Sequence, residues 1–81
     1  MYEDIKEPIK VVVLFRNGKA IPHSFEWRGR EYPVETVNLE YKLQHGESHI
    51  FCFSISSIGN SYELSFDNIN LVWKLERIWN G

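Results

Sequence analysis

Apolar side chains recur at every second position along most of this 81-residue chain, and no other feature of the sequence constrains the fold as strongly. Successive side chains of a β-strand point to opposite faces of the sheet, so a period of two indicates strands rather than helices. The alternating runs are separated by residue pairs that favour tight hairpin turns. These pairs are Asn17-Gly18, Arg28-Gly29, His45-Gly46 and Gly59-Asn60. We therefore expect an all-β protein built from antiparallel hairpins.

Six strands in meander order account for the alternating runs. They cover residues 9–16, 20–27, 32–43, 49–56, 61–67 and 71–79. The third run changes phase near Glu35-Thr36, and its later apolar positions are Val37, Leu39, Tyr41 and Leu43. A β-bulge or sharp bend at such a point lets a strand leave one sheet and enter another. The expected architecture is thus a small coiled or partly open antiparallel barrel, similar to SH3-like barrels.

The interior of this barrel needs large side chains, because a chain of this length has a thin core. We expect it to contain Phe25, Trp27, Tyr32, Phe53, Leu64 and Trp73. In the second run, Ile21 and His23 share the face of Phe25, and Pro22 marks an edge or a bulge. A turn of even length within residues 28–31 would keep Phe25 on the same face as Tyr32.

The last three runs give further expectations about which residues face each other. With a turn at residues 59–60, Phe53 lies opposite Phe66 and Ile55 lies opposite Leu64. The turn after residue 67 leads into a final run that continues the same apolar face. Simple alternation in that run places Arg77 and Trp79 on the core face.

The length suits a single β-domain over residues 9–81, preceded by a flexible segment of residues 1–8. That segment is rich in charge and lacks the apolar stretch of a signal peptide, and no run is long enough to cross a membrane. The single cysteine, Cys52, cannot form an internal disulfide and suits a reducing compartment. We expect a cytoplasmic protein.

The charge is unevenly distributed although the net charge is only −2. Residues 10–30 contain five basic side chains and one acidic side chain, an excess of +4. Residues 31–67 contain six acidic side chains and one basic side chain, an excess of −5. Neighbouring strands with opposite charges can pair across a sheet, and this interpretation is preferred over a basic face for a polyanion.

No group of residues in the sequence indicates catalysis or a cofactor. His45 and His49 flank the Gly46 turn and, together with Glu47, are the only candidate metal ligands, but a zinc site needs three or four ligands at defined spacing. Cys52 lies in the middle of a run, with no base near it in the sequence to activate the thiol. We therefore expect neither an enzyme nor a bound metal.

The segment W-R-G-R-E-Y at residues 27–32 combines two aromatic and two basic side chains. Such a mixture can stack bases and hold phosphates, as single-strand binders do. The candidate binding face consists of Arg16, Lys19, Trp27, Arg28 and Arg30. The alternative, which we prefer, is that Trp27 and Tyr32 are cross-strand core partners covered by the stems of the arginines.

Three segments of the chain resemble a group of small bacterial proteins of unknown function. They are W-R-G-R-E-Y-P-V at residues 27–34, Y-E-L-S-F-D at 62–67 and W-K-L-E-R-I at 73–78. In that group a W-x-G-R-x-Y-x-V hairpin leads to a Y-E-L strand and a final W-x-L-x-x-V/I strand. The resemblance covers most of residues 10–79 and implies a bacterial β-module without an assigned activity. Some similar proteins neighbour DNA-repair polymerases.

The sequence thus predicts a non-enzymatic β-module that binds a protein partner or associates with itself. The apolar pair Ile78-Trp79 near the chain end is a candidate interaction patch, acting either as the lid of the barrel or as a dimer contact. The alternative function is binding of single-stranded nucleic acid through the basic and aromatic face.

Overall fold

The computed structural model describes residues 1–80 and arranges them in seven antiparallel strands. The strands are β1 (Tyr2–Arg16), β2 (Lys19–Trp27), β3 (Arg30–Pro33), β4 (Thr36–His45), β5 (Ser48–Ser57), β6 (Asn60–Asp67) and β7 (Val72–Trp79). No helix that could cross a membrane occurs in this part of the chain. Residue 81, the end of the expected domain, lies outside the described residues.

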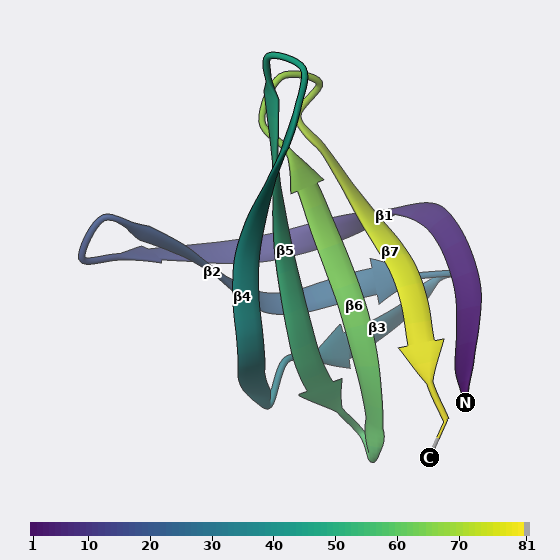
Figure 1. The fold of residues 1–81 in the computed structure, drawn as a ribbon. Helices are drawn as coiled ribbons and strands as arrows, with labels where there is room; N and C mark the ends of the chain where they lie inside the picture. Colours follow the sequence, from purple (N-terminus) through teal and green to yellow (C-terminus); the bar gives the residue numbers. More distant parts are fainter. Residues whose placement is uncertain (81) are drawn as a thin grey trace.

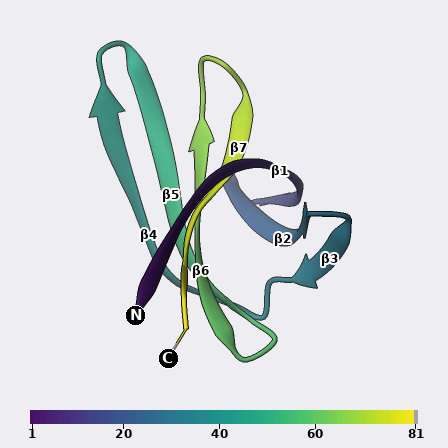
Figure 2. The ribbon, with the colours of Figure 1, turned by 90° about the vertical axis from the view of Figure 1, so that its right-hand side faces the viewer.

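The strands form one hydrogen-bonded series in the order β3-β2-β1-β7-β6-β5-β4, which curls into a half-barrel (Figures 1 and 2). Strands β4 to β7 lie side by side, and β2, β3 and the second half of β1 cross behind them. The long strand β1 belongs to both parts, because residues 2–9 pair with β7 and residues 10–16 pair with β2. The all-β, partly open barrel expected from the sequence is confirmed, with seven strands in place of six.

The additional strand arises where the expected third run changes phase. Residues 34 and 35 lie outside strands, and they separate β3 from β4. The backbone N–H of Val34 donates to the carbonyl of His23 at 2.9 Å, whereas that of Glu35 donates to the carbonyl of Ser56 at 2.9 Å. Two consecutive residues therefore bond to different parts of the half-barrel, as the phase change predicted.

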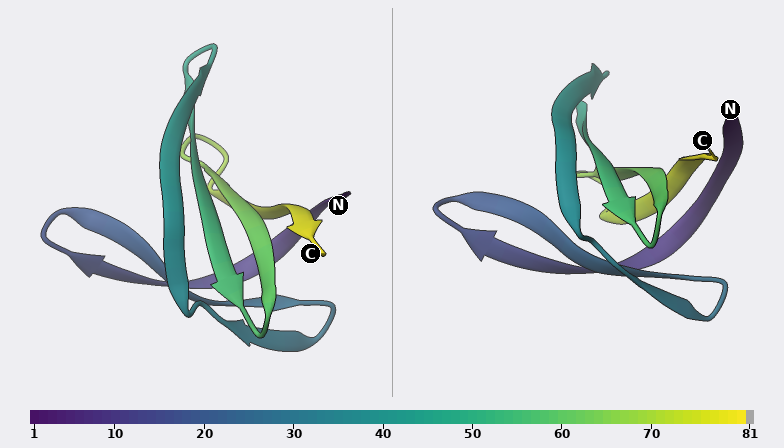
Figure 3. Two further views of the ribbon diagram at one scale, coloured as in Figure 1. Left: turned by 60° about the horizontal axis from the view of Figure 1, so that its bottom comes forward. Right: turned by 90° about the horizontal axis from the view of Figure 1, so that it is seen from below.

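The N-terminal residues are part of the sheet. Residues 1–8 were expected to form a flexible segment ahead of the domain, but Tyr2, Glu3 and Asp4 pair with Trp79, Ile78 and Arg77 of β7. A bulge between Asp4 and Glu7 then bends β1 toward β2. The two termini consequently lie close together (Figure 3).

The core fills the concave side of the half-barrel. Its buried residues are Phe25, Phe53, Ile55, Tyr62, Leu64, Leu75 and Ile78. Aromatic rings connect the two parts of the sheet, since the ring of Phe25 stacks on that of Tyr32 at 4.9 Å and meets that of Tyr62 at 5.3 Å. Trp27, Tyr32 and Trp73, also expected in the interior, are half-buried against this cluster. Phe53 and Leu64 are buried as expected.

The turns around the core follow the sequence closely. Asn17-Gly18 and Arg28-Gly29 each form a two-residue turn in which both residues have positive φ, as tight hairpins require. The even turn after Trp27 places Phe25 opposite Tyr32, which confirms their shared face. Between β6 and β7, the carboxylate of Asp67 accepts hydrogen bonds from the backbone of the next residues and fixes the expected turn.

The register between β5 and β6 differs by two residues from the expected one. Ile55 lies opposite Tyr62, and Phe53 lies opposite Leu64. The turn is Ile58-Gly59 rather than Gly59-Asn60, and Ile58 itself has a positive φ of 45°. A shift of two leaves every side chain on its expected face, because strand faces alternate with a period of two.

A bulge in β2 changes the face of Ile21. Ser24 pairs with Val12 and Pro22 pairs with Val13, so His23 is the extra residue. Of the two alternatives expected at Pro22, an edge or a bulge, the structure has the bulge. Ile21 pairs with Leu14 and therefore points away from the core face that Phe25 occupies, so the expectation that they share a face was wrong.

Two further bulges reverse faces that simple alternation assigned. In β4 the register shifts between Val37 and Leu39, so Val37 packs on the core while Leu39, Tyr41 and Leu43 point to the convex face. The expectation that these four side chains share one face is wrong for this reason.

In β7 the extra residue is Glu76. Leu75 pairs with Leu64, but Arg77 pairs with Glu63, which brings Ile78 into the core. The expected faces of Arg77, Ile78 and Trp79 are therefore all reversed. Ile78 is a core residue rather than part of a surface patch, and Trp79 lies on the convex face.

We expect the substitution Leu64→Ala to lower the free energy of unfolding by about 2–5 kcal/mol, because it leaves a cavity in the core. Leu64 is fully buried, whereas Leu71 in the last turn is 72% exposed. The matched control Leu71→Ala should change the free energy by less than about 0.5 kcal/mol. Urea unfolding followed by tryptophan fluorescence measures both. Equal losses in the two variants would contradict this location of the core.

Candidate functional site

The five residues of the expected basic and aromatic face lie at two separate places. Arg16 and Lys19 face each other at the tip of the β1–β2 hairpin. Trp27, Arg28 and Arg30 lie at the other end of β2, beside the turn to β3. At about 3.3 Å per residue, the length of β2 separates the two groups by on the order of 25 Å. The structure does not bring these residues together into one face.

The group at the β2–β3 turn is joined to the start of the chain by Glu7. The indole Nε1 of Trp27 donates to one carboxylate oxygen of Glu7 at 2.9 Å, and the guanidinium of Arg28 donates to both oxygens, at 2.7 and 3.3 Å. The guanidinium of Arg28 also lies 4.5 Å from the ring centre of Trp27. The hydrogen bond from Arg28 contributes most to lowering the pKa of Glu7, and the bond from Trp27 comes second. The hydrogen bond between Arg28 and Glu7 also raises the pKa of Arg28. Arg28 is therefore committed to an internal partner.

Arg30 covers the other aromatic residue of the segment. Its guanidinium lies 5.5 Å from the ring centre of Tyr32, and the rings of Trp27 and Tyr32 are 6.1 Å apart. Trp27 and Tyr32 are thus neighbours across β2 and β3, each with an arginine over its ring. This arrangement matches the preferred interpretation of the segment, in which arginines shield partly buried rings.

A cleft opens where the half-barrel does not close, between the tip of the β1–β2 hairpin and the concave face of β4 to β7. It has a volume of about 400 Å³ and is lined by Phe15, Gly18, Lys19, Ala20, Glu40, Phe51, Phe53, Phe66 and Trp73. We refer to these nine residues as the aromatic cleft. The β1–β2 hairpin, whose tip carries four of these residues, projects past β4 in Figure 1.

Aromatic rings form both walls of the cleft. Trp73 packs against Phe66 and Phe53, with ring centres 5.0 and 5.7 Å apart. The ammonium of Lys42 lies 6.0 Å from the ring centre of Phe51 at the rim. Phe15, on the opposite wall, is 82% exposed. A large aromatic side chain left in water at the mouth of an apolar cleft is typical of a contact surface.

This cleft was not expected from the sequence. Val11, Val13 and Phe15 alternate along one face of β1, and the ladder with β2 places that face on the concave side. The sequence did contain a signal for the cleft, which is the length of this alternation. It continues to the turn at residue 17, although only the part near Val11 packs on the core. Phe66 and Trp73 were assigned to the correct face, but the exposed fraction of their rings depends on how far the other strands extend over them.

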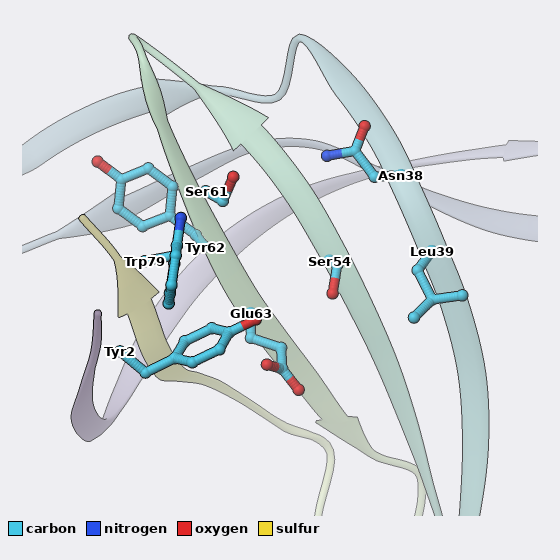
Figure 4. Close-up of a pocket in the computed structure, with 8 residues that line it drawn as sticks. All are labelled: Tyr2, Asn38, Leu39, Ser54, Ser61, Tyr62, Glu63 and Trp79. Atoms are coloured by element: carbon cyan, nitrogen blue, oxygen red, sulfur yellow. The ribbon is translucent and has the colours of Figure 1, made fainter. Parts of the chain in front are cut away.

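The convex face carries a second group, around Glu63 (Figure 4). Its carboxylate accepts a hydrogen bond from the hydroxyl of Tyr41 at 2.7 Å and forms an ion pair with Arg77 at 3.1 Å. The guanidinium of Arg77 lies 5.2 Å from the ring centre of Tyr2, which in turn packs on Trp79 at 4.7 Å. The bond to Glu63 raises the pKa of Tyr41, so its phenol keeps its proton and remains the donor.

The hollow beside this group has a volume of about 360 Å³. Its lining mixes polar and apolar side chains and consists of Tyr2, Asn38, Leu39, Ser54, Ser61, Tyr62, Glu63 and Trp79. Trp79 is the member of the expected Ile78-Trp79 patch that stays exposed. Its partner there is Tyr2 of the same chain.

The candidate metal ligands and the thiol do not form a reactive group. His45 lies opposite Ser48, and His49 lies opposite Gln44, so the two histidines that flank the turn do not face each other. In residues 1–80 no three histidine, cysteine, aspartate or glutamate side chains gather closely enough to hold a metal ion. Cys52 is buried, and this burial raises the pKa of its thiol. The thiol is therefore not activated as a nucleophile.

Comparisons with models of protein families, with curated proteins and with solved structures found no match. The resemblance to a group of small bacterial β-proteins accordingly stays a prediction.

We expect Glu7→Gln to reduce stability at neutral pH and to flatten the dependence of stability on pH. The pKa of Glu7 is lowered from 4.5 in the folded protein, so its stabilising effect is present above the unfolded pKa and is lost as pH falls through the folded value. The gap between wild type and variant should therefore close in acid.

Urea unfolding at pH 7 and at pH 3 measures this gap. Arg28→Gln should flatten the pH dependence in the same way, because it removes the partner that contributes most to the shift. A gap between wild type and Glu7→Gln that stays constant down to pH 3 would contradict the role given to this ion pair.

Proposed function

We propose that this protein is a non-enzymatic binding module that accepts an apolar segment of a partner protein in its aromatic cleft. The observation that carries the proposal is the open cleft itself, with Phe15 exposed on one wall and Phe51, Phe66 and Trp73 on the other. Aromatic side chains are enriched at protein interfaces because each buries a large area with little loss of conformational freedom.

The chemistry of the lining supports binding rather than catalysis. Of the nine residues that line the cleft, two are ionisable, Lys19 and Glu40, and the others are apolar or aromatic side chains and one glycine. An apolar site with a few polar groups at its rim is suited to holding a ligand and fixing its orientation. Lys42 beside Phe51 adds a second ammonium group at this rim.

Two further proposals accompany this function. The buried, free thiol of Cys52 supports a reducing compartment, and we propose the cytoplasm. The same open barrel also suits association between copies of the chain, because exposed apolar surface is removed from water whichever protein covers it.

The cleft can be tested with a displayed library of random peptides selected against the folded protein. We expect enrichment of peptides rich in aromatic and aliphatic residues, and loss of their binding in the variant Phe15→Ser. Phe15 is 82% exposed, so this change removes a cleft wall without opening the core. The matched control is Leu43→Ser on the convex face, which should bind the selected peptides as the wild type does. Selected peptides that bind Phe15→Ser with unchanged affinity would overturn the proposal.

Binding of single-stranded nucleic acid is the alternative function, and the geometry does not favour it. The basic residues lie in two groups, and Arg28 is paired with Glu7. We expect oligothymidine to cause no quenching of tryptophan fluorescence even at about 20 mM salt, where phosphate contacts are strongest. Quenching that weakens steeply with added salt, and that is lost in Arg30→Ser, would instead support the nucleic-acid function.

A further inference from the structure

Strand β4 is a long exposed edge of the sheet. It has ten residues, and all of them except Val37 are exposed. Within residues 1–80, β5 is the strand that pairs with it, and the opposite edge carries no strand. Natural edge strands are usually short, covered, or protected by proline, by a bulge or by inward-pointing charges, because their open backbone groups pair readily with another strand. β4 is long, exposed and free of proline. It does have a bulge at Asn38 and two charged residues on its concave side, Glu40 and Lys42, and these two charges have opposite signs.

The backbone groups that face this open edge follow from the turn to β5. His45 and Ser48 flank the two-residue turn at Gly46-Glu47 and are therefore a hydrogen-bonded pair of the ladder. Hydrogen-bonded and non-bonded pairs alternate along an antiparallel ladder, so Tyr41 and Leu43 direct their N–H and C=O groups to β5. The backbone N–H and C=O groups of Glu40 and Lys42, which alternate with Tyr41 and Leu43 along the strand, point to the open edge. These groups are available to a strand from another chain.

The side chains of β4 are complementary to themselves. An antiparallel pairing with a two-fold axis at Tyr41 places residues equally distant from Tyr41 opposite each other. It pairs Leu39 with Leu43 on the convex face and Glu40 with Lys42 on the concave face, and symmetry makes each pair twice. Facing apolar pairs and facing opposite charges both stabilise neighbouring strands.

Other registers lack this match. An axis at Glu40 or at Lys42 brings two like charges directly opposite each other, which is destabilising. An axis between two residues would place a leucine of the convex face opposite a charged residue of the concave face. Opposite residues of a ladder share a face, so such a register is excluded. An axis at Leu43 places Lys42 opposite Gln44, and an axis at Leu39 places Glu40 opposite Asn38, so neither forms a facing pair of opposite charges. The axis at Tyr41 is therefore the favoured one.

The surroundings of the axis fit this pairing. The hydroxyl of Tyr41 is held by Glu63 across β5, which keeps the ring over its own sheet. Leu39 and Leu43 are 56% and 53% exposed, and they are the side chains that a second copy would cover. We propose that β4 pairs with β4 of a second copy about an axis at Tyr41, which produces a symmetric dimer with one continuous sheet.

This inference does not depend on the proposed function, because the pairing is made by the open backbone edge of β4 and not by the aromatic rings of the cleft. Glu40, which lines the cleft, and Lys42 at its rim belong to both surfaces. Leu43→Ser separates the two proposals, since it weakens the dimer and leaves the walls of the cleft intact. A wild type that is monomeric and still binds the selected peptides would refute the dimer alone, and a dimeric wild type that binds none would refute the cleft alone.

The test is a charge exchange at Glu40 and Lys42, with mass measured by sedimentation velocity across a range of concentrations. Glu40→Lys and Lys42→Glu each place like charges opposite each other twice, so each should weaken the dimer by about tenfold or more. An equimolar mixture of the two variants should form a heterodimer, because every facing pair is then of opposite charge. The variant carrying both exchanges should dimerise as the wild type does.

Glu26→Lys makes the same change of charge on β2, and this control should leave the dimer unchanged. Both positions in β4 are exposed, and thermal melting confirms that each variant is folded. A wild type that stays monomeric at about 1 mM overturns the inference. Single variants that dimerise like the wild type, or a mixture that forms no heterodimer, also overturn it.

Discussion

The fold depends on one constraint, which is that two segments of the chain belong to both parts of the half-barrel. β1 pairs with β7 through its first half and with β2 through its second, and residues 34 and 35 bond to β2 and β5 in turn. Because the sheet is bent at both places, Phe25 of one part comes to lie against Tyr62 of the other, and a small core can exclude water. The ion pair of Glu7 with Arg28 fastens the bend in β1 to the β2–β3 turn.

The sequence predicted the features that depend on local geometry, and it assigned side chains to the wrong face of the sheet where a single residue was inserted into a ladder. The β-class, the hairpin turns and the strand crossing near residue 35 follow from alternation and turn chemistry. Bulges at Asn38 and Glu76 reverse the faces of Leu39 and Ile78, yet a bulge requires no particular residue type, so alternation cannot reveal it. The burial of Ile78 was mispredicted for this reason, although its apolar character was evident.

The residues of the candidate basic face lie apart for a different reason, which concerns distance along a strand. Lys19 and Arg28 are close in sequence, but an extended strand separates its two ends by nearly its full length. The partner of Arg28 is Glu7, which lies twenty-one residues away in a segment that we had placed outside the domain. Neither the separation nor the pairing can be derived from composition, because both depend on how β1 is bent.

The aromatic cleft and the open edge of β4 have a common origin in the incomplete barrel. Closure would require the two edge strands, β3 and β4, to pair with each other. β3 has four residues and β4 has ten, and the link of residues 34 and 35 carries the chain directly from one part of the sheet into the other. A four-residue strand satisfies less than half of the backbone groups along β4. The edge therefore stays open within one chain, and the rings that a closed barrel would enclose remain accessible beside Phe15. A second strand of equal length and complementary sequence removes this deficit, and another β4 is such a strand.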